Sequence, residues 1–279
     1  MKKIILDKRQ FWLHIGMHRT ATTSCQIAFK YIAGLGFSKD YFYYPKTGTN
    51  SVSNRYGHND LVSGAQRKVN EDLFSDLRSE LLSIPVEVPI LLSAEEFWIS
   101  NPCEILAQLG PGKVNLVYFE REFFSWVLSI WSLVALSEPI FTPYEFILGA
   151  LEEIQYKNSI DEISFYDVDR VLNRWKTAIN KRGRCYKIDF PKDLPHMEIL
   201  NLVVRNQTPK EWMNIDIAVN ASRSIADILS DINAIGPREL RLNAFSSSLL
   251  DQRILDIEHI SNLKFPRQSQ FLNDLISIN

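Results

Sequence analysis

The feature that most constrains the fold is an apolar run that passes through a glycine loop into a helical pattern. Residues 11–15 (Phe-Trp-Leu-His-Ile) are typical of a buried strand. Gly16 opens a loop, and from Thr22 small or apolar residues recur at the spacing of one helix face: Cys25, Ala28, Phe29, Ile32 and Ala33. A strand, a tight loop and a helix start present backbone N–H groups and a positive helix end to an anion. This stretch therefore predicts an α/β chain with a phosphate-binding loop.

The loop departs from a Walker P-loop, in which a glycine and four residues are followed by Gly-Lys-Ser/Thr. Here Ala21, Thr22 and Thr23 stand at those positions, so the cation of this loop is Arg19 instead of the Walker lysine. The hydroxyls from Thr22 to Ser24 occupy N-cap and first-turn positions. An ordinary strand–turn–helix corner without a ligand would have the same pattern and stays the alternative.

The rest of the chain alternates between strand and helix patterns. Further apolar runs predict strands at 41–44, 88–93, 114–119 and 185–190. Residues 56–60 are predicted to lead into a helix that ends at about Leu82 and whose apolar face contains Leu73, Phe74, Leu77 and Leu81. Further helical patterns are predicted at about 123–136, 143–180 and 220–235, followed by a helical C-terminal part. This alternation predicts a three-layer α/β/α fold with a mostly parallel central sheet, in one domain spanning residues 1–279.

Charged side chains follow two of the predicted strands. Glu95 comes after the strand at 88–93, and Arg121 comes after the strand at 114–119. Ligands of open α/β sheets bind outside the carboxyl ends of the strands, and a guanidinium makes bidentate contacts with phosphate. Ser129 lies two helical turns beyond Arg121 and could support the same anion. Pairing of Arg121 with a neighbouring glutamate is an equally simple explanation.

The loop and the Arg121/Ser129 pair together resemble the sulfotransferases that use 3′-phosphoadenosine 5′-phosphosulfate (PAPS), in particular bacterial carbohydrate-type members. Residues 18–24 (His-Arg-Thr-Ala-Thr-Thr-Ser) are similar to their 5′-phosphosulfate loop, usually Lys-Thr-Gly-Thr-Thr. Arg19 replaces the lysine and Ala21 replaces the glycine. Arg121 and Ser129 have the spacing of the arginine and serine that reach the 3′-phosphate in that family.

The resemblance implies a P-loop NTPase-like fold and transfer of a sulfonate from PAPS to a hydroxyl or amine of a carbohydrate or other small acceptor. It implies that these residues bind the donor: His18, Arg19, Thr20, Ala21, Thr22, Thr23, Ser24, Arg121 and Ser129. Arg19 would also stabilise the leaving phosphate, and the scheme requires no metal. We expect the general base to be Glu95, with His58 as the second choice.

Two other functions are compatible with the same residues. The first is a non-catalytic nucleotide- or glycan-binding relative of the family with a degenerate loop. The second is a small-molecule kinase, against which the missing Walker lysine argues. A second segment, Pro-Lys-Thr-Gly-Thr-Asn at 45–50, matches the family loop more closely by its letters. A polar stretch without helical period follows it, so we predict a surface loop there.

Charge and composition restrict the classes of partner and the cellular location that we expect. The net charge of −2 provides no bulk electrostatic attraction to nucleic acid or to an anionic membrane. The three cysteines, Cys25, Cys103 and Cys185, lack metal-site spacing and are predicted to be buried, reduced thiols. The N-terminal apolar run is too short for a signal peptide, and 123–136 is shorter than a membrane span. We therefore expect a cytoplasmic protein with a small-molecule or glycan acceptor; the sequence does not indicate its oligomeric state.

Overall fold

The computed structural model describes residues 9–34, 41–49, 56–63, 68–137, 143–190, 194–205, 208–209 and 212. The chain divides into two compact units. The first consists of residues 1–121 and 157–221, and the second of residues 122–156 and 222–279. The organisation as a single domain stays a prediction.

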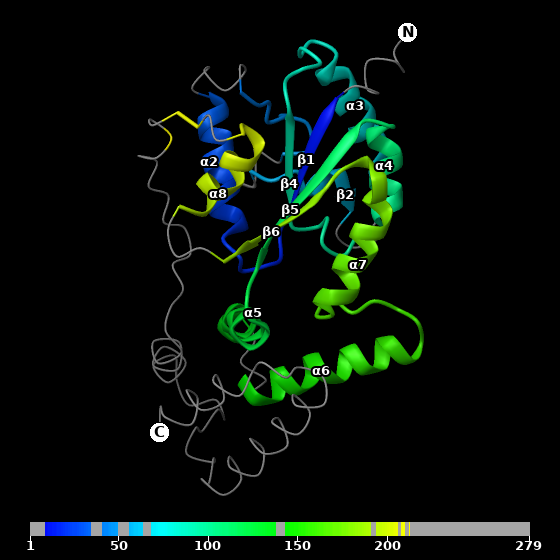
Figure 1. Cartoon of the computed structure of the whole chain (residues 1–279). Coiled ribbons are helices and arrows are strands. Elements are labelled where there is room, and N and C mark those ends of the chain that lie inside the picture. Colours follow the sequence, from blue (N-terminus) through cyan, green and yellow to red (C-terminus); the bar gives the residue numbers. More distant parts are fainter. Residues whose placement is uncertain are drawn as a thin grey trace, which may run out of the picture. The chain divides into compact units, whose positions relative to one another are not determined.

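The first unit is built on a sheet of four parallel strands (Figure 1). In spatial order these are β4 (Ile90–Ala94), β1 (Gln10–Ile15), β5 (Lys113–Glu120) and β6 (Cys185–Asp189). Leu13 of β1 is paired with Leu92 on one side and Leu116 on the other. Because helices cover both faces, β1, β4 and β5 are almost continuously apolar and buried.

Helices lie on both faces of this sheet (Figure 1). The helices α2 (Thr22–Gly34) and α8 (Pro195–Val203) pack together on one face. On the other face lie α3 (Glu71–Leu81), α4 (Pro102–Leu109) and α7 (Val168–Ile179). The predicted three-layer α/β/α fold with a parallel sheet is therefore confirmed, as are the first strand and the helix that begins at Thr22.

Several local predictions were wrong. In the segment 41–44 only Tyr43 pairs with a strand, through a single bridge to Ile90. The helix predicted to follow residues 56–60 and to end at about Leu82 is confirmed in its apolar part as α3, in which Phe74, Leu77 and Leu81 are buried. It begins later than predicted, because a 3₁₀ turn η2 (Asn59–Leu61) and the antiparallel strands β2 (Val62–Ser63) and β3 (Lys68–Val69) precede it. The helix predicted at 143–180 is interrupted between α6 (Pro143–Ser159) and α7, which the 3₁₀ turn η3 (Asn180–Arg182) follows. Among the cysteines, which are all free thiols, Cys25 is buried but Cys103 is exposed.

Cap residues explain where the unexpected helix boundaries fall. Asn70 accepts a hydrogen bond from the backbone of Leu73 (3.2 Å) and starts α3, and Asp167 accepts one from Arg170 (3.1 Å) and starts α7. The helix α4, which was not predicted, begins with Asn101 as cap and Pro102 in its first turn. The helix α8 was not predicted either, and the helix predicted at 220–235 lies outside the described residues.

The described part of the second unit contains α5 (Phe123–Ser137) and most of α6. The Glu122 carboxylate accepts hydrogen bonds from the backbone of Phe124 (2.9 Å) and Ser125 (2.7 Å) and so caps the start of α5. The predicted helix at 123–136 is confirmed, and its residues 123–131 are buried or half-buried. Among the helices that the structure describes, none has the length and apolarity that a membrane crossing needs.

Candidate functional site

The predicted anion loop joins β1 to α2 at the carboxyl edge of the sheet. The Gly16 backbone donates to the Ala94 carbonyl (3.1 Å), which ties the start of the loop to the end of β4. A Cβ atom on Gly16 would lie 2.4 Å from two atoms of the Thr22 side chain. Gly16 is therefore required because α2 begins directly against the end of β1.

The hydroxyls of Thr20 and Thr22 hold the loop together. Thr20 Oγ1 donates to the Met17 carbonyl (2.7 Å), and Thr22 Oγ1 donates to the same oxygen (3.2 Å). Both threonines are buried, whereas Thr23 is half-buried. Thr23 and the first-turn N–H groups of α2 are thus better placed for an anion than the two buried hydroxyls. The first turn of α2 contains no acidic residue that would compete with a bound anion.

Two loop residues adopt left-handed backbone conformations, Arg19 with φ of 65° and Ala21 with φ of 56°. Ala21 is the position at which the resembling family usually has glycine. An L-residue in this region is disfavoured because its Cβ approaches the carbonyl oxygen.

We expect Ala21→Gly to raise the free energy of unfolding by about 1 kcal/mol, because glycine adopts this backbone conformation without strain. The control is Ala33→Gly inside α2, which should lower it by roughly the same amount. Urea titration of both variants measures the two changes. A destabilised Ala21→Gly variant would contradict the strain argument.

Arg121 is in direct contact with the loop. It follows the last residue of β5, and its Nη1 donates to the Arg19 carbonyl at 2.8 Å. Its guanidinium also lies over the Phe190 ring, 5.2 Å from the centroid. The two motifs, 102 residues apart in the chain, meet because β1 and β5 are neighbouring strands. The chain leaves β1 toward β4 and leaves β5 toward β6, so the contact lies at the switch point where ligands of open sheets bind.

Glu95 lies on the other side of the loop, directly after β4, and contacts His18. Glu95 Oε2 is 3.1 Å from His18 Nδ1. Asn59 Oδ1 accepts hydrogen bonds from the backbones of Glu95 (2.8 Å) and Glu96 (3.4 Å) and so holds this turn. Burial by itself lowers the pKa of His18, but the hydrogen bond to Glu95 and the charges of both glutamates outweigh it and raise the pKa. The His18 ring also lies 5.5 Å from the Phe165 ring.

His58 is fully buried, and its ring links two backbone segments through hydrogen bonds. Ser93 N donates to its Nδ1 (3.1 Å), so Nε2 carries the proton and donates to the Pro45 carbonyl (3.0 Å). Burial lowers the pKa of His58 to about 4. Both ring nitrogens are engaged, which disfavours His58 as the general base. His14, which belongs to the predicted buried strand at 11–15, is buried beside Phe29 and Phe119.

Ser129, the predicted partner of Arg121, is a half-buried residue of α5 and belongs to the second unit. Its joint contact with a ligand therefore stays a prediction. No group of three or more histidine, cysteine, aspartate or glutamate side chains in the described part of the chain could hold a metal ion.

The second candidate loop, described from 45 to 49, holds one of the protein's own carboxylates. The backbones of Lys46 (2.8 Å) and Thr47 (2.9 Å) and the hydroxyl of Tyr43 (2.7 Å) donate to Glu80. Burial raises the pKa of Glu80, but these hydrogen bonds outweigh it and lower the pKa. The local sequence does not indicate this use, because the carboxylate that the loop binds comes from α3.

No family model matches the chain, and no curated protein matches it. Among solved structures, it is similar to retinol dehydratase in a complex with retinol and PAP, with 11% identity and a TM-score of 0.32 over 91% of this chain and 82% of that one. A second match is retinol dehydratase with androsterone and the inactive cofactor PAP, with 12% identity and a TM-score of 0.32 over 92% and 82% of the two chains.

Proposed function

We propose that this chain transfers a sulfonate from PAPS to a hydroxyl or amine of a carbohydrate or other small acceptor. One observation supports this more than any other: Arg121 Nη1 donates to the Arg19 carbonyl at 2.8 Å. Two cations that the sequence motif assigns to the two ends of one nucleotide thus lie at one edge of the sheet. The first turn of α2 adds backbone donors and no carboxylate. These residues fit a doubly phosphorylated nucleotide.

The proposal assigns roles as follows. Arg19 and the first-turn amides of α2 hold the 5′-phosphosulfate and stabilise charge on the leaving phosphate oxygen. Arg121, with Ser129 as a further proposed contact, holds the 3′-phosphate. The donor, when bound, supplies the sulfonate; the S–O bond to its phosphate breaks as the acceptor oxygen or nitrogen bonds to sulfur. The acceptor proton passes to a base on the protein.

Glu95 was the expected general base, but its contact with His18 favours a different choice. Glu95 Oε2 accepts the Nδ1 proton of His18 at 3.1 Å and orients the ring, which leaves Nε2 as the proton acceptor. We propose His18 as the base and Glu95 as its positioning residue. The His18 side chain is 40% exposed, so an acceptor can approach it.

The experiment begins with 3′-phosphoadenosine 5′-phosphate (PAP), the product nucleotide. At a hundredfold excess over its Kd we expect it to raise the melting temperature by roughly 5–10 °C. Arg19→Ala should abolish most of this shift and lower the transfer rate at least about a hundredfold. Lys46→Ala in the other loop is the matched control and should change neither. No shift with the wild type, or a shift lost in Lys46→Ala alone, would refute the proposal.

One observation favours the non-catalytic alternative. The hydroxyls of Thr20 and Thr22 donate hydrogen bonds to the Met17 carbonyl and are therefore engaged within the loop itself. A relative that only binds the nucleotide would show the melting shift without transfer. Incubation with ³⁵S-labelled donor and a panel of sugar and phenol acceptors separates the two. Labelled product that depends on His18 would establish transfer, whereas binding without product would support the alternative.

A further inference from the structure

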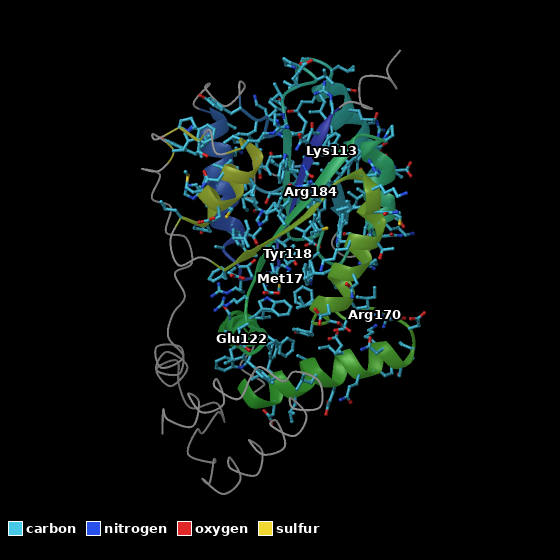
Figure 2. All side chains as sticks on the ribbon, in the orientation of Figure 1. Met17, Lys113, Tyr118, Glu122, Arg170 and Arg184 are labelled. Carbon is cyan, nitrogen blue, oxygen red and sulfur yellow. The ribbon has the colours of Figure 1, made fainter. Side chains whose placement is uncertain are left out.

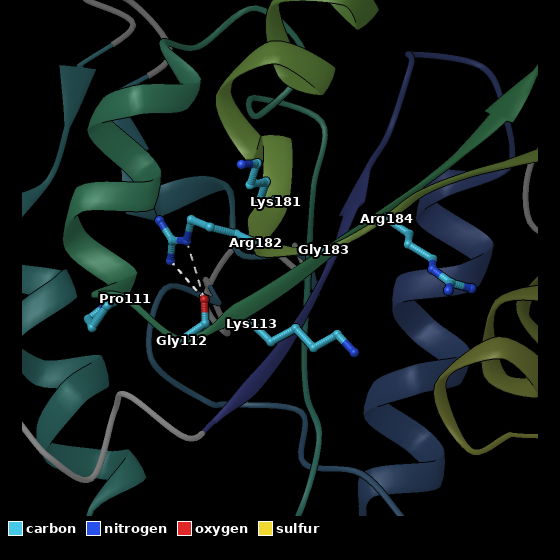
Figure 3. Close-up of a pocket in the computed structure, with 7 residues that line it drawn as sticks. All are labelled: Pro111, Gly112, Lys113, Lys181, Arg182, Gly183 and Arg184. Atoms are coloured by element: carbon cyan, nitrogen blue, oxygen red, sulfur yellow. Dashed lines mark hydrogen bonds between the residues drawn. The ribbon is translucent and has the colours of Figure 1, made fainter.

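A hollow lies at the amino edge of the sheet. It has a volume of about 520 Å³ and lies where β5 begins and η3 leads into β6 (Figure 3). Its lining residues are Pro111, Gly112, Lys113, Lys181, Arg182, Gly183 and Arg184. In Figure 2, Lys113 and Arg184 lie toward one end of the sheet, and Met17 of the candidate loop lies toward the other. The hollow is therefore separate from the proposed donor site.

The lining is strongly basic. Four of its seven residues are cationic, and none of these described lining residues is acidic. The whole chain has a net charge of −2, so this positive charge is a local feature. Pockets of a few hundred Å³ are the usual size for small ligands.

Arg182 contributes positive charge to this pocket, but most of its N–H groups already donate hydrogen bonds to backbone carbonyls. Its guanidinium donates to the Gly112 carbonyl (3.0 Å), to the Leu106 carbonyl (3.3 Å) and to the Gly110 carbonyl at the end of α4 (Figure 3 shows the bonds to Gly112). These bonds satisfy the C-terminal carbonyls of α4. The remaining cations, Lys113, Lys181 and Arg184, are therefore the groups available to a ligand.

Lys113 and Arg184 are held on one wall. Lys113 N donates to the Arg9 carbonyl (2.9 Å), and Arg184 N donates to Asn115 Oδ1 (3.2 Å). Both side chains extend to the same side of the strands, whereas Lys181 extends away from them (Figure 3). Both are exposed, and the side chain of neither makes an ion pair or hydrogen bond with another residue that the structure describes. The starts of β5 and β6 thus place two exposed cationic side chains on the same side of the strands.

We infer that this pocket binds a small polyanion that carries clustered phosphate or sulfate groups. The donors are an ammonium and a guanidinium, which form charge-assisted hydrogen bonds with such oxyanions. Lys181 on the opposite side adds attraction for a ligand with several charges. The inference does not depend on sulfonate transfer, because none of these residues belongs to the proposed donor site.

The test uses two defined probes at 100 mM NaCl, inorganic tripolyphosphate and sucrose octasulfate, with calorimetry and amide chemical shifts. The wild type should bind at least one of them with shifts at Gly112 and Gly183. The probe that binds with the lower Kd indicates whether the pocket prefers phosphate groups or a sulfated sugar. Lys113→Ala/Arg184→Ala should weaken binding about a hundredfold, roughly tenfold for each charge-assisted contact.

The matched control is Lys68→Ala/Lys157→Ala, which removes the same charge outside the pocket and should change Kd less than about threefold. Arg19→Ala should leave the shifts at Gly183 intact, which separates this site from the proposed donor site. Lys113→Glu provides a second variant, and its binding should be weaker than that of the wild type. Absence of binding to both probes, or equal loss in the control, would overturn the inference.

Discussion

Replacing Gly183 with alanine is expected to lower the free energy of unfolding of the first unit by at least about 3 kcal/mol. A Cβ atom there would lie 1.7 Å from the Val114 carbonyl oxygen. The contact is with backbone, so no side-chain rotation can relieve it. The strands β5 and β6 would have to separate at their start, where Leu116 N donates to the Arg184 carbonyl (2.8 Å) and Arg184 N to Asn115 (3.2 Å).

Gly34→Ala is the matched control for this substitution. Gly34 is the last residue of α2, and a Cβ atom there would meet nothing within 4 Å. The free energy of unfolding of the Gly34→Ala variant should differ from that of the wild type by less than about 1 kcal/mol. Urea unfolding followed by tryptophan fluorescence measures both variants. A Gly183→Ala protein as stable as the wild type would show that β5 and β6 do not approach each other as closely as described.

Acidification from pH 7.5 to pH 5 is expected to lower the free energy of unfolding by roughly 4 kcal/mol through His14 and His58. Burial lowers the pKa of His14 to about 3 and that of His58 to about 4. Both are neutral in the folded protein, whereas in the unfolded chain they take up protons near pH 6.5. Their stabilising contribution is therefore present above pH 6.5 and is lost as the pH falls toward 4. His18, whose pKa is raised, opposes this trend in part.

A non-titrating variant separates this effect from other acid effects. His14→Asn keeps a hydrogen-bonding group near the position of Nδ1, which lies 2.8 Å from Ser93 Oγ. Between pH 6 and pH 5 the slope of the unfolding free energy against pH should decrease by close to one proton. Urea titrations at pH 7.5, 6 and 5 measure this slope for both proteins. An identical slope in the variant would show that His14 titrates normally in the fold.

The sequence predicted the long apolar runs well, whereas the short run at 41–44 was wrongly predicted to be a strand. The buried strands at 11–15 and 114–119, the helix from Thr22 and the helix at 123–136 are apolar runs whose period is unambiguous. The polar segments between 56 and 69 and at 160–167 were predicted poorly. There the boundaries depend on single cap residues such as Asn70 and Asp167, which a search for apolar periodicity does not register.

For the candidate site, the sequence by itself determined the residue types: an arginine in a glycine-led loop, an arginine after β5 and a carboxylate after β4. Only the tertiary structure decided which of them meet. The order of neighbouring strands places Arg121 against Arg19 and Glu95 against His18. It also buries His58 between two backbone segments and places Glu80 in the second loop, because such contacts depend on distant strands and helices that local sequence does not specify.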